Sequence, residues 1–200
     1  MDAFNLLKQD HRKVAELFEQ LESSRGQAKL RVFEQIKMEL DLHAHIEETV
    51  FYPALEEPKQ THEIVLEAYE EHDVVKKLLR ELSRAKTANE EWEAKAKVLQ
   101  ENVEHHVEEE ENELFKKASA ALSREEIDEL GEQLAAEKNR KQRSAASKGS
   151  KKSSGASKSA SKTKSASTAA KRARSTGSKK SGSKKAGSGS KSRSNKSTKK

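Results

Sequence analysis

The feature that most constrains the fold is an apolar stripe of helical period that occurs four times along the chain, each time with one histidine inside it. The second stripe runs through six positions separated by alternating steps of four and three residues: Ile36, Leu40, His43, Glu47, Val50 and Ala54. Residues three and four apart share one face of an α-helix, so His43 and Glu47 lie on the same face as the apolar members. A carboxylate on such a face is costly unless it is paired or bound to a metal. We therefore expect Glu47 and His43 to face a cation.

Helix boundaries follow from the residues that flank the stripes. Asp2 can cap a first helix that ends at Ser24, and a second helix runs from Gln27 until Pro58 stops it, with Pro53 able to kink it. A third helix is predicted over 61–86. Capping boxes predict the starts of two further helices: Thr87 with Glu90 opens the fourth, and Ser123 with Glu126 opens a short fifth. Four long amphipathic helices with short connections predict an all-α, up-down-up-down four-helix bundle, here with a short fifth helix.

The two halves of the predicted bundle repeat one another. The matched positions are Asp10-His11 with Glu71-His72, and His43-x-x-x-Glu47 with His106-x-x-x-Glu110. The first histidine precedes the second by 32 residues in one half and by 34 in the other. At ~1.5 Å per residue, the four histidines differ in depth by only ~4–5 Å when neighbouring helices are antiparallel. We therefore expect four imidazoles and two carboxylates to meet in one layer.

The donor atoms of this layer suit a metal site without sulfur. The chain has no cysteine, which excludes disulfides, thiolate ligands and cysteine nucleophiles. Imidazole with carboxylate suits iron, manganese or zinc. Six ligands are too many for one tetrahedral zinc ion and about right for two octahedral ions bridged by carboxylates. A single buried histidine is more often an ordinary core residue, but four of them with two buried carboxylates would be costly without bound cations.

Other histidines and glutamates near the stripes are expected to lie outside the metal layer. His45 is on the opposite face of its helix, and His62 and His105 are at stripe edges, so all three are predicted at the surface. Glu48 and Glu111 directly follow two expected ligands. We expect these two carboxylates to be solvated or to contact the ligands from outside.

The arrangement resembles the hemerythrin family, specifically its HHE-type cation-binding domains, over about residues 5–120. The resemblance rests on the isolated His11, on His43-x-x-x-Glu47, on Glu71-His72 followed by an apolar heptad, and on His106-x-x-x-Glu110. It implies a non-haem centre of two iron ions, with zinc or manganese as alternative metals, in a four-helix bundle that binds oxygen or reacts with it. The implied terminal ligands are His11, His43, His72 and His106, and the implied bridging carboxylates are Glu47 and Glu110.

Two positions depart from the pattern of the respiratory hemerythrins. Their third helix carries a His-x-x-x-His pair, whereas Ala68 stands at the first of these positions here. Their fourth helix has an aspartate five residues after its histidine, whereas Glu110 follows His106 by four. One imidazole is therefore missing, which leaves an open coordination position and favours sensing, redox chemistry or iron handling over oxygen carriage.

Charge divides the chain into two parts. All 34 Asp and Glu residues lie at or before Glu137, whereas 22 of the 40 Lys and Arg residues follow it, so the formal charge is −16 for residues 1–137 and +22 for residues 138–200. We expect the bundle to occupy residues 1–137. Residues 138–200, rich in Lys, Ser and Ala, resemble the tails of linker histones and histone-like bacterial proteins and are expected to be disordered. We expect such a polycation to bind DNA or RNA without sequence specificity, by counterion release; the alternatives are a solubilising linker and a segment that binds the acidic residues 1–137 of the same chain.

Three function classes follow from these features. The first is a protein that binds or senses oxygen, nitric oxide or peroxide at two iron ions, with a tail that binds nucleic acid. The second is a peroxidase, ferroxidase or iron-handling protein, and the third is a structural protein of the nucleoid. No apolar run approaches the ~20 residues of a membrane span, and no signal pattern opens the chain, so we expect a cytoplasmic protein located at the nucleoid when the tail is engaged.

Overall fold

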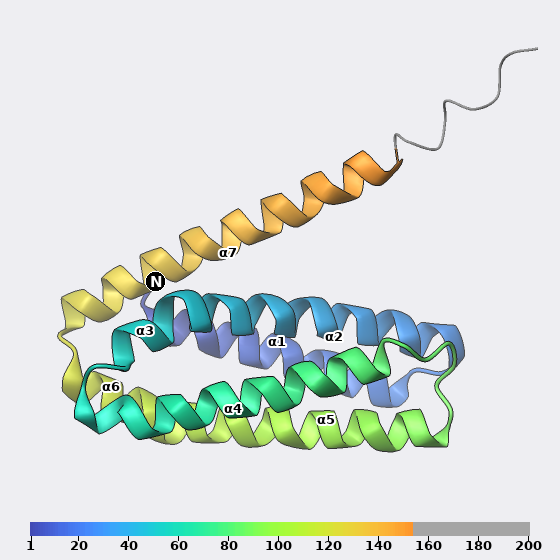
Figure 1. Cartoon of the computed structure of the whole chain (residues 1–200), viewed down its shortest axis with the longest axis horizontal. Helices are drawn as coiled ribbons and strands as arrows, with labels where there is room; N and C mark the ends of the chain where they lie inside the picture. The colour runs from blue at the N-terminus through green and yellow to red at the C-terminus, as the bar shows by residue number, and fades with distance from the viewer. Residues whose placement is uncertain (154–200) are drawn as a thin grey trace, which may run out of the picture. The chain divides into compact units, whose positions relative to one another are not determined.

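All regular secondary structure in residues 1–153, the part of the chain that the computed structural model describes, is helical (Figure 1). The helices are α1 (Ala3–Ser23), α2 (Gly26–Ile46), α3 (Tyr52–Leu55), α4 (Lys59–Leu82), α5 (Glu90–Glu109), α6 (Phe115–Ala121) and α7 (Arg124–Ser153), with two π-helical turns, η1 (Glu47–Phe51) and η2 (Glu110–Leu114). Within these residues, no helix has the length and apolar character needed to cross a bilayer.

The elements form four long helical segments, because two of them run without a break through a π-helical turn. One segment is α2 with η1 and α3, the other is α5 with η2 and α6, and α1 and α4 complete the set. Figure 1 shows the four segments side by side, with each connection at one end of the bundle. The predicted all-α four-helix bundle is confirmed.

Side-chain caps fix two helix starts as the sequence predicts. The Asp2 carboxylate accepts a hydrogen bond from the backbone N–H of Asn5 at the start of α1. At the start of α7, the backbone N–H of Ser123 donates to Glu126, and the backbone N–H of Glu126 donates to the Ser123 hydroxyl oxygen. This reciprocal pair is a capping box, which satisfies two backbone donors that the helix itself leaves unpaired.

The start of α5 differs from the prediction. The N-cap is Asn89, whose side chain accepts the backbone N–H of Trp92 at 3.0 Å, rather than Thr87. Asparagine is at least as good an N-cap as threonine, so the nearer asparagine sets the boundary two residues later than predicted.

Two apolar clusters fill the bundle, one on each side of the expected metal layer. Along α1, for example, His11 separates Leu7 of the first cluster from Val14 of the second, and the other three segments are arranged in the same way. The largest fully buried members are Leu7, Ile46, Phe51, Tyr52, Leu55, Leu114 and Leu134 in the first cluster, and Phe33, Ile36, Leu79, Leu82 and Leu99 in the second. The polar layer is thus held between two dry cores that fix its position.

The fifth long helix, α7, extends further than predicted. It buries Leu130 and Leu134 in the first cluster and continues to Ser153, into the segment expected to be disordered. The reason is composition: the added residues are mostly Lys, Arg, Ala, Gln and Ser, of which all but Ser are strong helix formers. The predicted disorder of the tail beyond Ser153 falls on residues 154–200, which lie outside the described part of the chain.

Gly131 allows α7 to approach the N-terminus of the chain. A Cβ at this position would lie 2.3 Å from the Met1 carbonyl oxygen and 2.8 Å from the Ala3 nitrogen, and these backbone atoms cannot rotate away. We expect Gly131→Ala to lower the free energy of unfolding, since overpacking costs about 1–3 kcal/mol and alanine's better helix propensity returns only about 1 kcal/mol. Urea unfolding would measure the change, with Gln133→Ala on the exposed face of α7 as the control. Equal or greater stability of Gly131→Ala would contradict this close contact.

Candidate metal centre

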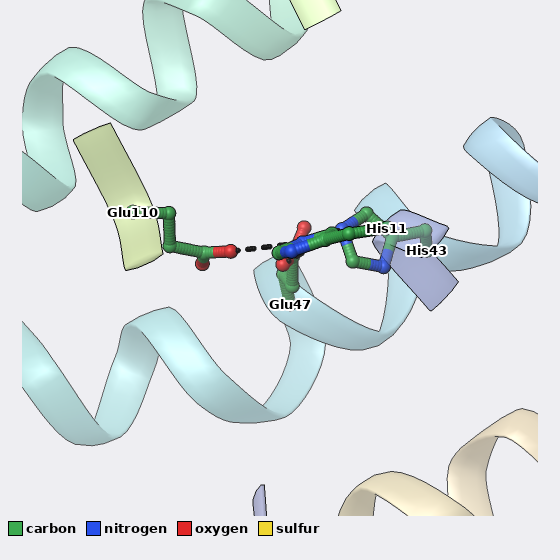
Figure 2. A group of neighbouring side chains, drawn as sticks. All are labelled: His11, His43, Glu47 and Glu110. Carbon is green, nitrogen blue, oxygen red and sulfur yellow. Dashed lines mark hydrogen bonds and ion pairs between the residues drawn. The ribbon is translucent and has the colours of Figure 1, made fainter. Parts of the chain in front are cut away.

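The six side chains predicted as ligands meet in one buried layer. The Nε2 atoms of His11 and His43 lie 3.1 Å apart, and those of His72 and His106 lie 3.3 Å apart. All six residues are buried, and Glu47 is completely inaccessible to solvent. Figure 2 shows four of them, with Glu110 reaching from one side of the layer toward His11, His43 and Glu47 on the other.

Glu47 lies between the two pairs of histidines. Its Oε1 is 3.0 Å from His43 Nε2, and its Oε2 is 3.3 Å from His72 Nε2. One carboxylate therefore presents one oxygen to each half of the bundle. Glu47 thus contributes a donor atom toward both pairs of histidines.

The donor atoms form two groups that share Glu47. Within each group the donor atoms lie within 4.8 Å of one another; the first group contains His11, His43, Glu47 and Glu110, and the second contains Glu47, His72 and His106. Glu110 belongs only to the first group, where its Oε2 is 3.2 Å from His11 Nε2. The role of Glu110 as a second bridging carboxylate stays a prediction, and the donor atoms place this residue with His11 and His43.

Both carboxylates are buried beside imidazoles of the other candidate ligands. Imidazole nitrogens lie 3.0–3.3 Å from both oxygens of Glu47 and from Oε2 of Glu110, but none of the four carboxylate oxygens makes a hydrogen bond of good geometry. A buried carboxylate without such hydrogen bonds is costly, and metal coordination is one of the few arrangements that compensates for it. The six side chains thus offer nitrogen and oxygen donors that fit bound cations.

A π-helical turn begins at each of the two glutamates. In η1 the N–H of Tyr52 donates to the carbonyl of Glu47, and in η2 the N–H of Phe115 donates to the carbonyl of Glu110. Pro53, which was expected to kink this segment, follows η1. Proline cannot be the common cause of the two π-helical turns, because η2 contains no proline. Such turns occur frequently at functional sites, and here they mark the glutamates in both halves.

A second set of four carboxylates lies behind the histidines. Each faces one Nδ1 atom: Glu111 at 2.8 Å from His11, Glu48 at 2.8 Å from His72, Glu71 at 2.7 Å from His106, and Asp10 at 3.7 Å from His43. When Nδ1 donates to such a carboxylate, Nε2 is left to face the layer and becomes more basic, as in many metal sites. We call these four residues the outer carboxylates.

The outer carboxylates join the four helical segments into a ring. Asp10 of α1 faces a histidine on α2, Glu48 of η1 faces one on α4, Glu71 of α4 faces one on α5, and Glu111 of η2 faces one on α1. A lysine lies outside three of them, Lys138 beside Asp10, Lys76 beside Glu48 and Lys8 beside Glu111, and His105 lies beside Glu71. Each of the four histidines therefore faces a carboxylate on the neighbouring helical segment.

The sequence predicted the candidate ligands more completely than it predicted the residues that surround them. Glu48 and Glu111 were expected either in solvent or against the ligands, and the second alternative is correct. Asp10 and Glu71 were noted only as part of the repeat, although the acid that precedes a histidine in both halves was a usable signal. Tyr52 is a core residue of the first cluster, and its hydroxyl also lies 3.3 Å from His72 Nε2.

The three remaining histidines lie away from the layer, as predicted. His62 contacts the backbone carbonyl of Glu56, and His105 is exposed. His45 is only partly exposed, because its Nε2 lies 2.6 Å from Glu137 on α7. The fifth helix thus covers a side chain that would otherwise face solvent.

Charge in the layer is balanced by protons when no cation is bound. Burial alone lowers the pKa of His43, but the neighbouring carboxylates of Glu47, Asp10 and Glu110 together outweigh burial and raise this pKa to about 10. Burial and the charge of Glu47 together raise the pKa of Glu110. Cations that enter the layer must therefore displace protons, which couples their binding to deprotonation of the ligands.

The outer carboxylates should affect metal affinity without touching the metal. We expect Glu71→Gln to weaken metal binding about 10- to 100-fold, since loss of such a support typically has this effect. Isothermal titration of the metal-free protein would measure it. The matched control is Glu70→Gln, one residue away on the exposed face of α4. Equal affinity in both variants would show that the contact between Glu71 and His106 does not support the ligand.

Comparison with known proteins gives three matches. The family model described as the Hemerythrin HHE cation binding domain matches residues 2–118. The crystal structure of a hemerythrin HHE cation binding domain-containing protein from Mycobacterium kansasii, the Rv2633c homolog, is similar with a TM-score of 0.66 at 26% identity, covering 74% of this chain and 91% of that one. A DNA nickase from Nostoc sp. (strain PCC 7120 / SAG 25.82 / UTEX 2576) is 30% identical over 146 residues, which span 71% of this chain but only 40% of that protein.

Proposed function

Because this chain belongs to the hemerythrin HHE cation binding family, we propose that it holds two iron ions between its helical hairpins and binds a small diatomic molecule or peroxide there. The observation that carries the proposal is the pair of donor groups that share Glu47, whose two oxygens face different pairs of histidines. Four imidazoles and two carboxylates suit two bridged iron ions, with zinc or manganese as the alternatives.

The number of ligands leaves room for a further molecule. The second group offers only three donors, from Glu47, His72 and His106, so an octahedral ion there would have open positions. A small pocket of about 20 Å³ adjoins the four histidines, which is enough for one water-sized molecule. Its other walls are apolar, with Val14, Leu40 and Val75 among them. A small uncharged ligand suits such a pocket.

Metal analysis and absorption spectra test this proposal directly. We expect the purified protein to contain two iron ions per chain and to show an iron spectrum that changes when oxygen or nitric oxide is added to the reduced protein. A double variant with His43→Ala and His106→Ala should lose both the metal and the spectrum. Absence of bound metal in the wild-type protein after anaerobic loading with Fe(II) would refute the proposal.

The same experiment separates a sensor from an enzyme. A sensor or carrier changes its spectrum once and consumes no further oxidant. A peroxidase or ferroxidase consumes peroxide or Fe(II) in many-fold excess over the protein. We favour the sensor because the pocket beside the histidines is small and mostly apolar, with no room for the organic reductant that a peroxidase would oxidise and no donor apart from the histidines to guide a stream of Fe(II) ions.

Non-specific nucleic-acid binding is the second half of the proposed function. Its support is the formal charge of +22 on residues 138–200, together with similarity to a protein named as a DNA nickase. A polycation of this kind binds phosphates by counterion release. The test is a gel-shift experiment with duplex DNA at ~50 mM salt, where failure to shift would remove this half of the proposal.

Two alternatives can be decided with the same DNA. A structural nucleoid protein would compact DNA equally well with and without His43→Ala and His106→Ala, whereas a metal-dependent role would not survive these changes. Nicking, suggested only by the name of the relative, would convert supercoiled plasmid to the open circle in a metal-dependent way. The proposed location that follows is the cytoplasm, at the nucleoid.

A further inference from the structure

A surface groove runs along the boundary between α1 and α5 and ends at the metal layer. Its volume is about 310 Å³, and its walls come from both helices and from η2. His11, one of the candidate ligands, is buried and is among the lining residues. The groove therefore reaches the edge of the layer from the solvent side.

The groove and the inner pocket share one wall. Four residues line both of them: His11, Val14, Val103 and Val107. Three of these are valines, which offer no donor atom to a passing ion and exclude water by their size. A small movement of these side chains would join the two spaces.

The repeat of the two halves shows why the groove is open on this side. In the matched positions of the other half, Lys76 of α4 occupies the place that Ala15 has in α1. Lys76 reaches across to η1, with its Nζ 2.5 Å from Glu48 Oε1, and so lies across the boundary between α4 and η1. Ala15 is exposed, lines the groove and has no side chain long enough to reach Glu111.

We propose that the groove between α1 and α5 is the port through which an uncharged small molecule reaches the metal layer. This step rests on the proposed function and adds to it the route and the class of ligand. A cation would lose its hydration at the wall of valines without gaining ligands. A neutral diatomic molecule such as nitric oxide or oxygen is weakly hydrated, so it loses little hydration free energy there.

The charges at the groove select against anions. Glu104, Glu108 and Glu111 line it, and among the described residues one lysine and no arginine pairs with these three: Lys8, whose Nζ lies 3.8 Å from Glu111. One lysine cannot balance three carboxylates. Anionic ligands such as azide should therefore enter more slowly than neutral ligands of similar size.

The experiment is to close the port without altering the layer. Ala15→Met places a long, uncharged, helix-compatible side chain in the groove. Nitric oxide binding to the reduced, iron-loaded full-length protein would be followed by stopped-flow absorbance. We expect the association and dissociation rates both to fall about tenfold while the dissociation constant stays unchanged, since a blocked path alters rates and not the bound state. Ala94→Met, on an exposed part of α5 outside the groove, is the matched control and should leave both rates unchanged.

A second variant tests the selection by charge. The double change Glu104→Gln and Glu108→Gln should speed azide binding to the oxidised protein and leave nitric oxide binding unchanged. Rates for nitric oxide that are equal in Ala15→Met and the wild-type protein would overturn the port. So would slower Fe(II) loading of Ala15→Met with no effect on nitric oxide, because the groove would then serve a cation. Failure of the wild-type protein to bind nitric oxide at all would instead contradict the proposed function.

Discussion

Replacing Glu47 with glutamine is expected to remove both metal ions, whereas replacing Glu110 with glutamine should remove only one. The reason is geometric: Glu47 contributes an oxygen to each donor group, and Glu110 contributes only to the group with His11 and His43. Glutamine has the size of glutamate but lacks the charge that a bridging ligand supplies. Metal content per chain, measured after gel filtration, gives the result directly.

The same pair of variants should differ in stability. A ligand present at 1,000 times its dissociation constant adds about 4 kcal/mol to the free energy of unfolding, so two ions have a large effect. We expect the stabilisation by bound metal, measured by thermal unfolding with and without metal, to vanish in Glu47→Gln and to be halved in Glu110→Gln. Glu16→Gln, an exposed change on α1, serves as control. Two ions bound to Glu47→Gln would contradict the bridging position of this residue.

Truncation after Ser153 should cause the largest loss of nucleic-acid binding. The removed residues 154–200 carry most of the cationic charge of the segment that follows Glu137, and no acid offsets it. A protein that contacts 6–10 phosphates loses about 10³–10⁵-fold in affinity between 50 and 200 mM salt, and we expect a dependence of this order for the full chain. Fluorescence anisotropy with duplex DNA at several salt concentrations measures both quantities.

A shuffled tail is the sharpest control for that experiment. It keeps the composition of residues 154–200 and changes their order, so binding by charge alone predicts unchanged affinity and unchanged salt dependence. Loss of binding on shuffling would show that the tail reads sequence or adopts a specific structure. Unchanged binding by the truncated protein would instead place the nucleic-acid surface within residues 1–153.

The sequence was a good guide where a regular period decides the structure. The stripe that carries His43 and Glu47 faces the core because residues three and four apart share a helix face. The matched spacing in the second half predicted the common layer for the same reason. Capping by Asp2 and by Ser123 with Glu126 could also be predicted, since each depends only on neighbouring residues.

The features that the sequence did not predict depend on tertiary contacts. The π-helical turns at Glu47 and Glu110 require hydrogen bonds that no local propensity distinguishes from those of an α-helix. The contact between Glu71 and His106 depends on how α4 and α5 are rotated relative to one another. The length of α7 was missed because low hydrophobicity was taken as a sign of disorder, although strong helix formers extend the helix beyond its apolar face.

The ring of outer carboxylates has a mechanical consequence for the whole bundle. Each of the four long segments both supplies an acid to one neighbour and receives one from the other. No segment can slide or rotate alone without disturbing two of these contacts. The spacing of the four segments at this level is therefore coupled. A change in the charge of the bound cations would be resisted by all four contacts, and any displacement would be shared by all four segments.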